Sequence, residues 1–300
     1  MSSVLVVGVD GRDQSRDAVA LGAALASASG GELVLAHVVP YDPLAYSMAL
    51  GAPPASPLHD EADEMLREAA QDAPAGTRTV VMPASSPPRG LHLLAEREDA
   101  RAVVVGSTHR GAVGRVMLGS HTEHVVTGSP CAVAVAPKGL AGMDWSVGRI
   151  AVAFDGEPES REALHVGREL ASASGARLLL CAVAPGAVTE WSAYTYTPDW
   201  TDVQRRRTQS FEEQLAAVAD GAETEVRAGD VVEELVDLSR SVDLLVLGSR
   251  AYGPVRRVLL GSTSHRLVRE AHAPVLVVPR SAIADATRAD QPSGATAGSR

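Results

Sequence analysis

The sequence predicts an α/β fold of two tandem domains. Each domain is expected to hold a doubly wound parallel sheet of five strands in the order 3-2-1-4-5, with helices on both faces. Three observations lead there. The chain has 300 residues, about twice the usual domain length. It repeats itself at a nearly constant offset. Each repeat alternates short apolar runs with segments of helical periodicity, as β-α units around a parallel sheet do.

The repeat extends over most of the chain. The run ALASASGGELVLAHVVP at 24–40 matches ELASASGARLLLCAVAP at 169–185, an offset of 145 residues. Further on, VVVGSTHRGAVGRVMLGS at 103–120 matches LVLGSRAYGPVRRVLLGS at 245–262, an offset of 142 residues. We therefore expect domains at 1–140 and 148–280, joined by a linker near 138–147. The small, polar and unpatterned residues 281–300 predict a disordered tail.

The elements of each repeat follow from local patterns. An apolar run at 4–9 predicts a strand buried on both faces, and helical spacing over 15–28 ends at a pair of glycines. Further strands are expected at 33–39, 78–82, 102–105 and 131–136, with helices near 61–70, 88–97 and after Gly119. The second repeat predicts strands near 149–154, 178–184, 223–227, 243–247 and 275–278.

Composition excludes several classes of protein. The net charge of −10 is opposite to the cationic face that nucleic-acid and membrane-surface binders need. No apolar run reaches the roughly 18 residues of a membrane span, and the N-terminus lacks the basic stretch of a signal peptide. Cys131 and Cys181 lie in apolar runs and are expected to be buried thiols of a reducing compartment. We therefore expect a cytoplasmic protein.

Lysine is nearly absent from the chain. Lys138 is the single lysine among 27 Lys and Arg residues, and its context APKGL does not fit the GxxxxGK[ST] motif of a P-loop. Kinase and Schiff-base mechanisms also need a placed lysine. No other catalytic set is visible, so the sequence predicts that the protein is not an enzyme. Phosphates would depend on backbone N–H groups, hydroxyls and arginines.

Ligands of doubly wound sheets bind beyond the carboxyl ends of the strands, where the strand order reverses. In both repeats the first strand ends at an aspartate and the fourth at a glycine: Asp10 and Asp155, Gly106 and Gly248. A glycine-serine pair then stands where a helix should start: Gly119-Ser120 and Gly261-Ser262. Backbone N–H groups at a helix start, with a serine hydroxyl, form an anion site. The alternative is that these pairs are only turns and helix caps.

These residues resemble the universal stress protein family in its tandem form, over about residues 3–137 and 148–280. The family's marks are the opening VGVDG, the closing PVLVV strand and the spacing G-x2-G-x9-G-[ST]. The loops read Gly106-x2-His109-x9-Gly119-Ser120 and Gly248-x2-Ala251-x9-Gly261-Ser262. Both depart from the pattern at the second glycine, which is His109 in one repeat and Ala251 in the other.

The resemblance implies Rossmann-like domains of the adenine nucleotide alpha hydrolase-like type. It also implies regulatory binding of ATP or AMP in a stress response, with Mg²⁺ as a candidate companion. The loops would face phosphates and ribose, the aspartates the nucleoside, and the backbone at Val38 and Val183 the adenine edge. The residues so implied are Asp10, Val38, Gly106, His109, Gly119, Ser120, His121 and Thr122, then Asp155, Val183, Gly248, Ala251, Gly261, Ser262, Thr263 and Ser264.

Other readings stay open. A branch of the family with altered loops binds no nucleotide, so a nucleotide-independent dimerisation or interaction module is the main alternative, and a slow ATPase is another. The resemblance implies that the two domains pair through their fifth strands, and it allows a homodimer and an unidentified protein partner. His109, His121 and His124 are expected to face solvent, because no third ligand has the spacing of a zinc site. The aromatic residues after strand two predict loop anchors or a lid over the nucleotide: Tyr41, Tyr46, Trp191, Tyr194, Tyr196 and Trp200.

Overall fold

The computed structural model describes residues 4–40, 57–107, 114–116, 120–186, 200–249, 258 and 260–279. The first half contains β1 (Val4–Gly8), α1 (Asp13–Ser29), β2 (Glu32–Pro40), α3 (Pro57–Ala69), the 3₁₀ turn η1 (Ala70–Asp72), β3 (Arg78–Ala84), α4 (Pro87–Arg97), β4 (Ala102–Gly106), α5 (Ser120–Val126) and β5 (Ala132–Ala136). A 3₁₀ turn, η2 (Leu140–Gly142), follows. The second half contains β6 (Arg149–Ala153), α6 (Pro158–Ser174), β7 (Arg177–Pro185), α7 (Trp200–Val218), β8 (Glu223–Gly229), α8 (Val231–Leu238), β9 (Leu244–Gly248), α9 (Ser262–Glu270) and β10 (Val275–Val278).

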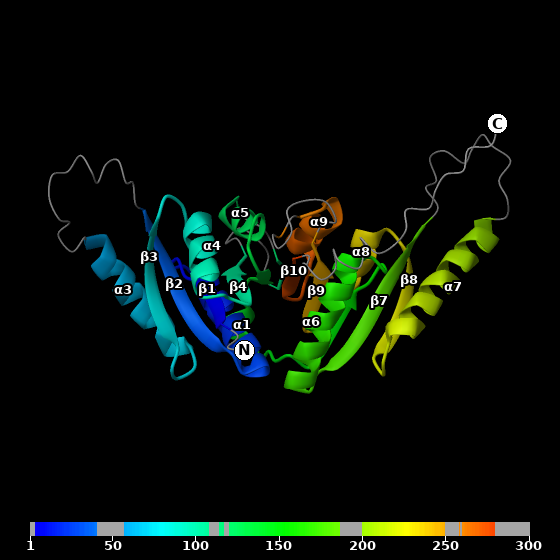
Figure 1. Ribbon diagram of the computed structural model, residues 1–300, viewed down its shortest axis with the longest axis horizontal. Helices are drawn as coiled ribbons and strands as arrows, with labels where there is room; N and C mark the ends of the chain where they lie inside the picture. Colours follow the sequence, from blue (N-terminus) through cyan, green and yellow to red (C-terminus); the bar gives the residue numbers. More distant parts are fainter. Residues whose placement is uncertain are drawn as a thin grey trace.

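All ten of these strands form one sheet (Figure 1). Its order is β3-β2-β1-β4-β5-β10-β9-β6-β7-β8, so each half has the order 3-2-1-4-5 and the two halves run in opposite senses from the centre. Within each half every strand pair is parallel. The predicted fold class is therefore confirmed.

The halves meet at a central antiparallel pair of strands, β5 and β10. In the register of this pair Ala134 lies opposite Leu276, and these two residues are equivalent in the repeats because they are 142 positions apart. An approximate two-fold axis therefore passes through the seam and relates one half to the other. This is the fifth-strand pairing that the family resemblance implied.

Two apolar layers cover the two faces of the sheet. Helices α1, α3, α6 and α7 contribute buried residues to one cluster, exemplified by Leu25, Leu66 and Leu215. Helices α4, α5, α8 and α9 contribute to the other, exemplified by Leu94 and Leu267. Because both faces are covered, the inner strands read as unbroken apolar runs rather than as alternating ones.

Element boundaries differ from the expected ones by up to four residues. Helices α1 and α6 end at Gly30 and Gly175, which adopt left-handed φ values of 64° and 72°; glycine takes this conformation without strain. Helix α3 begins at Pro57, earlier than the expected residue 61. Proline suits the first turn of a helix because the N–H that it lacks has no intrahelical partner there.

The linker between the halves lies against α1. Buried Asp17 accepts hydrogen bonds from the backbone N–H groups of Gly139, at 2.8 Å, and Ala141, at 2.9 Å. Leu140 between them is 2% exposed and belongs to the apolar cluster of α1. The linker is therefore fastened by one carboxylate and one apolar side chain. The expected tail at 281–300 lies outside the described residues.

No helix in the described part of the chain is long and apolar enough to span a lipid bilayer.

Candidate functional site

The strand order reverses between β1 and β4 in the first half and between β6 and β9 in the second. Beyond the carboxyl ends of these strands the chain turns into α1 or α6, or leads towards the start of α5 or α9. The two regions are related by the axis at the seam, and α5 and α9 lie near each other at the centre of the molecule (Figure 1). These are the two candidate sites.

Asp10 and Asp155 close the turn from strand to helix in each half. The Asp10 carboxylate accepts hydrogen bonds from the Ser15 hydroxyl, at 2.7 Å, and from the backbone N–H of Arg12, at 3.2 Å. Asp155 accepts from the backbone N–H of Glu157 at 3.0 Å. Both aspartates are exposed, so each shapes the turn while presenting a carboxylate edge to the candidate site.

Gly106 and Gly248 lie against the first turn of α1 and α6. A Cβ on Gly106 would overlap the carbonyl oxygen of Gln14, and one on Gly248 would lie 2.6 Å from the backbone of Glu159. Real Cβ atoms do not approach backbone that closely, so close packing of strand and helix itself requires glycine here. We expected these glycines to let the backbone come close to a ligand. The structure shows that they already let each strand come close to the protein's own helix.

The starts of α5 and α9 are tied to these same strand ends. The hydroxyl of Thr122 donates to the carbonyl oxygen of Gly106 at 3.2 Å, and the hydroxyl of Ser264 donates to that of Gly248 at 3.4 Å. Gly261 precedes α9 with φ −76° and ψ 173°, an extended conformation. The N–H groups of the first turn of α9, which have no intrahelical acceptor, therefore start next to the end of β9.

Two buried serines follow the strand-end glycines. Ser107 is 1% exposed and Ser249 is 6% exposed, and neither hydroxyl has a hydrogen-bond partner among the described residues. Their backbone N–H groups donate to Ala136 and Val278 of the neighbouring strands. An unsatisfied buried hydroxyl destabilises a fold by about 1–3 kcal/mol. Such a hydroxyl occurs at equivalent positions in the two halves, which indicates that both candidate sites share this feature.

The backbone at Val38 and Val183 extends past its inner neighbour. The ladder between β1 and β2 ends with Gly8 opposite Ala36, and the ladder between β6 and β7 ends with Ala153 opposite Cys181. Val38 keeps its partner in β3, and Val183 keeps its partner in β8. On the side of the candidate site, Val38 and Val183 therefore lie beyond the last residues paired with β1 and β6. Their backbone N–H and C=O groups on that side are not used by the sheet, as hydrogen bonding to a planar base would require.

One described residue in each glycine-motif loop forms a hydrogen bond across the seam. The N–H of Val116 donates to the carbonyl of Ala271 at 2.8 Å, and the N–H of Val258 donates to that of Ser129 at 2.9 Å. Val116 and Val258 are equivalent positions of the repeats, and both are fully buried. Each loop is thus fastened to the residues that follow the short helix of the other half.

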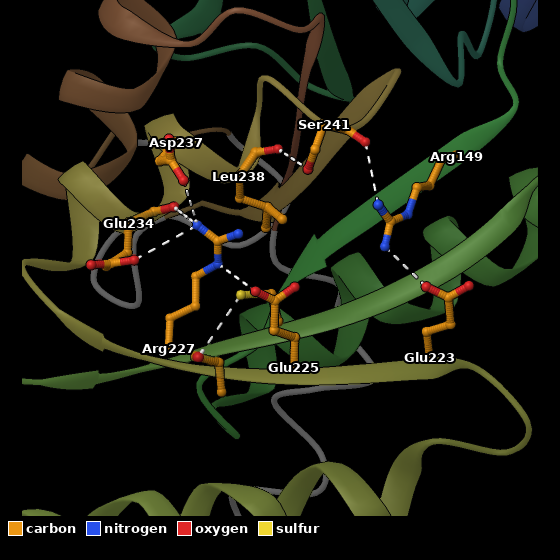
Figure 2. Close-up of polar contacts among 10 residues, drawn as sticks. Arg149, Glu223, Glu225, Arg227, Glu234, Asp237, Leu238 and Ser241 are labelled. Carbon is orange, nitrogen blue, oxygen red and sulfur yellow. Dashed lines mark hydrogen bonds and ion pairs between the residues drawn. The ribbon is translucent and has the colours of Figure 1, made fainter.

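In the second half, carboxylates surround an arginine of β8 (Figure 2). Arg227 of β8 donates to Glu225 at 2.7 Å and to Asp237 at 3.1 Å, and it lies 3.7 Å from the carboxylate of Glu234. Burial lowers the pKa of Arg227, but the hydrogen bonds that its guanidinium donates to Asp237 and Glu225 outweigh it, so the pKa is raised overall. The guanidinium is held by carboxylates, and the network joins β8 to α8 instead of presenting a cation to phosphate.

The sequence model of the Universal stress protein family matches residues 1–137 and 146–279. The chain belongs to the universal stress protein family.

Individual universal stress proteins are similar to this chain in sequence or in fold. One from Mycobacterium tuberculosis is 30% identical over 300 residues, covering 92% of this chain and 97% of the relative. The crystal structure of a universal stress protein from Archaeoglobus fulgidus superposes with a TM-score of 0.63 at 20% identity, covering 93% of this chain and 99% of that one. A universal stress protein solved in complex with cAMP covers 45% of this chain at 25% identity, with a TM-score of 0.38.

Several residues that the family resemblance implied fall outside the described part of the chain. They are His109, Gly119 and Ala251, together with the aromatic residues Tyr41, Tyr46, Trp191, Tyr194 and Tyr196. Ser120 and His121 are described only as backbone of α5, and Trp200 only as backbone of α7. Ser262 is exposed and Thr263 half-exposed in the first turn of α9, and His124 is exposed on α5.

Sequence reasoning about this universal stress protein missed two features of the sites. Ser107 and Ser249 gave no signal beyond standing after a glycine, because only the folded chain shows that their hydroxyls are buried with no partner among the described residues. His37 on β2 places its Nδ1 2.7 Å from the carbonyl oxygen of Val9, beside the first site. Among the described residues, no group of three or more His, Cys, Asp and Glu could hold a metal ion.

Proposed function

We propose that this universal stress protein binds an adenine nucleotide, ATP or AMP, beyond the ends of β9 and β4, and that it does so as a regulator instead of a catalyst. The observation that carries the proposal is the pair of buried, unpartnered hydroxyls of Ser249 and Ser107. A phosphate oxygen or a ribose hydroxyl would give these groups the partner that the described residues do not supply.

The second half is the better site. Helix α9 begins at Ser262 directly after an extended Gly261, so the N–H groups of its first turn are available for phosphate oxygens. The half-exposed hydroxyl of Thr263 lies in the same turn. Backbone N–H groups and a hydroxyl would then bind the anion without a lysine. This fits a chain whose single lysine is Lys138.

The base would lie against the open backbone edge at Val183, and in the first half at Val38. Adenine presents a donor and an acceptor along one edge, which match one backbone C=O and one N–H. Asp155 and Asp10 would lie beside the nucleoside, where their exposed carboxylates suit ribose hydroxyls or a Mg²⁺ ion that accompanies the phosphates. Nucleotide occupancy would bias the loops that cross the seam and thereby a surface for a protein partner.

One observation favours a second candidate, an interaction module that works without nucleotide. Gly106 and Gly248 are both required by the packing of strand against helix. Two glycines of the motif would therefore stay in place even in a chain that binds no ligand. In that case the paired halves themselves would be the functional unit.

Calorimetric titration of the full chain with ATP and with AMP separates the two candidates. We expect Gly261→Val to abolish binding in the second half, because the added side chain stands at the phosphate position. The extended φ of Gly261 suits any residue, so this variant should fold. Gly142→Val is the matched control, since nothing lies within 4 Å of the Cβ position of Gly142. Wild-type protein that binds neither nucleotide below millimolar concentration would overturn the proposal.

Ser249→Ala and Ser107→Ala give a sharper signature. Loss of one hydrogen bond to the ligand should weaken binding about tenfold, while removal of an unsatisfied buried hydroxyl should leave the free protein equally or more stable. A serine that only supports the fold would show the opposite pattern, with lower stability and unchanged affinity. Native mass spectrometry of freshly purified protein would show which nucleotide is carried along.

A further inference from the structure

A cavity of about 390 Å³ lies between α1 and α6, over the strands at the seam, and it belongs to neither candidate site. Its walls are mostly apolar, with Leu25 from α1, Leu170 from α6 and Leu276 from β10, and they also include Arg101 and Glu169. Glu162 of α6 and Pro279, the residue after β10, also line it. The cavity is large enough for one apolar side chain together with the backbone that carries it.

The two-fold axis at the seam relates this cavity to the region of the first half where the linker lies against α1. The linker therefore shows how a segment of chain could occupy the cavity. Asp17 and Glu162 are equivalent residues of the repeats, 145 positions apart. Asp17 accepts the N–H groups of Gly139 and Ala141 and holds the linker over α1. Glu162 stands at the same place on α6, beside the open cavity.

The chain leaves the two central strands in equivalent ways. After β5 it continues as Pro137-Lys138-Gly139-Leu140-Ala141, and after β10 as Pro279-Arg280-Ser281-Ala282-Ile283. Both segments begin with proline and a cation, and both place an aliphatic side chain three or four residues after the proline. Pro279, the last described residue, already lines the cavity, so a docking segment would have only to continue from it.

We propose that the segment 280–285 docks in this cavity as the linker docks on α1. The side chain of Ile283 fills the apolar space, one residue beyond the equivalent of buried Leu140, and the Glu162 carboxylate accepts the N–H of Ser281, the equivalent of Gly139. Arg280 adds charge complementarity to Glu162, whereas Glu169, which also lines the cavity, is already paired with Arg101. The part of the tail expected to be disordered then begins near residue 286.

The docked segment is held less firmly than the linker. Gly139 adopts a φ of 85° in the linker, and Ser281 stands at the equivalent position. A residue with a side chain is strained in that conformation, so the tail must take a slightly different path. Glu162 is one methylene longer than Asp17 and reaches farther from its helix. We therefore expect reversible docking.

Hydrogen exchange of the full chain, followed by mass spectrometry or NMR, tests this inference. We expect the amides at 281–283 to exchange about tenfold more slowly than those at 290–300, which corresponds to about 1.4 kcal/mol. Glu162→Gln and Ile283→Asp should each return them to the unprotected rate. Glu157→Gln, at the start of α6 where the side chain makes no capping bond, and Ala295→Asp are the matched controls and should change nothing.

Three outcomes would overturn the inference. In the first, the amides at 281–283 exchange at the unprotected rate in the wild-type protein. In the second, protection survives both Glu162→Gln and Ile283→Asp, so the segment is held elsewhere. In the third, protection falls on dilution, so the occupant is the tail of a second copy. Because none of these readouts involves nucleotide, the test stands apart from the proposed function.

Discussion

Glu123 and His265 occupy equivalent positions of the two repeats and face each other across the seam, with 3.1 Å between Glu123 Oε1 and His265 Nε2. They come from α5 and α9 and lie close to the two-fold axis. In a symmetric dimer of one repeat, a residue here would meet its own copy. Fusion of the repeats lets the two positions differ, so a carboxylate can meet an imidazole.

We predict that His265→Glu lowers the free energy of unfolding by about 0.5–1 kcal/mol, because it sets two carboxylates against each other at a half-exposed site. The double exchange Glu123→His with His265→Glu should recover most of the loss. Urea unfolding of the wild type, both single variants and the double variant measures the coupling as a double-mutant cycle. A coupling energy of zero would show that the pair contributes nothing to the joining of the halves.

Gly106→Ala should destabilise the protein by roughly 1–3 kcal/mol, since the methyl group meets the carbonyl oxygen of Gln14 and strand and helix must separate to admit it. Gly142→Ala is the control at an open position. Thermal unfolding without nucleotide is the right measurement, because the effect comes from packing. If Gly106→Ala unfolds like the wild type, the close contact between β4 and α1 is not rigid.

Asp17→Ala should cost about 1–3 kcal/mol, because it leaves the N–H groups of Gly139 and Ala141 without their acceptor. The loss should concentrate in the linker. Hydrogen exchange at residues 139–142 should accelerate more than exchange in β5 and β6 on either side. Asp13→Asn, on the first turn of the same helix, is a control for the change in charge. Uniform acceleration over the whole chain would argue against a local anchor.

Burial raises the pKa of the Cys181 thiol to about 12. The unfolded thiol ionises near pH 9, so between about pH 9 and 12 the folded state holds a proton that the unfolded state has lost. Stability must therefore fall as pH rises through this window, by up to about 1.4 kcal/mol per pH unit. Urea midpoints at pH 7.5 and pH 9.5 measure the fall, and Cys181→Ala should reduce it. A midpoint difference that is the same in wild type and Cys181→Ala would contradict this prediction.

The fold was predictable from sequence because its signals are local and are repeated. Apolar runs such as 4–8 and 102–106 mark strands covered on both faces, and glycines such as Gly30 and Gly175 mark helix ends. The repeat fixed the number of halves and the order of elements. The ends of α3 and β3 were less well predicted, because their limits depend on packing partners distant in sequence.

The candidate site was predictable only in part. The motif located the strand ends at Gly106 and Gly248 correctly, yet the physical demand for glycine there comes from Gln14 and Glu159, which no pattern pairs with them. The unpartnered hydroxyl of Ser249 could not have been found either, since its burial depends on strands and helices that meet only in the folded chain.

By itself, the sequence determined that this protein is a tandem α/β repeat whose phosphate chemistry, if any, works without lysine. Periodicity and composition are properties of neighbouring residues, and they are readable along the chain. The tertiary structure decided which residues face one another across the two-fold axis. It set Glu123 against His265, fastened the linker to Asp17 and formed the equivalent cavity beside Glu162, which no described residue fills. The contact of Glu123 with His265 depends on the antiparallel register of β5 and β10, and the others depend on how helices pack beside these strands; local sequence encodes neither.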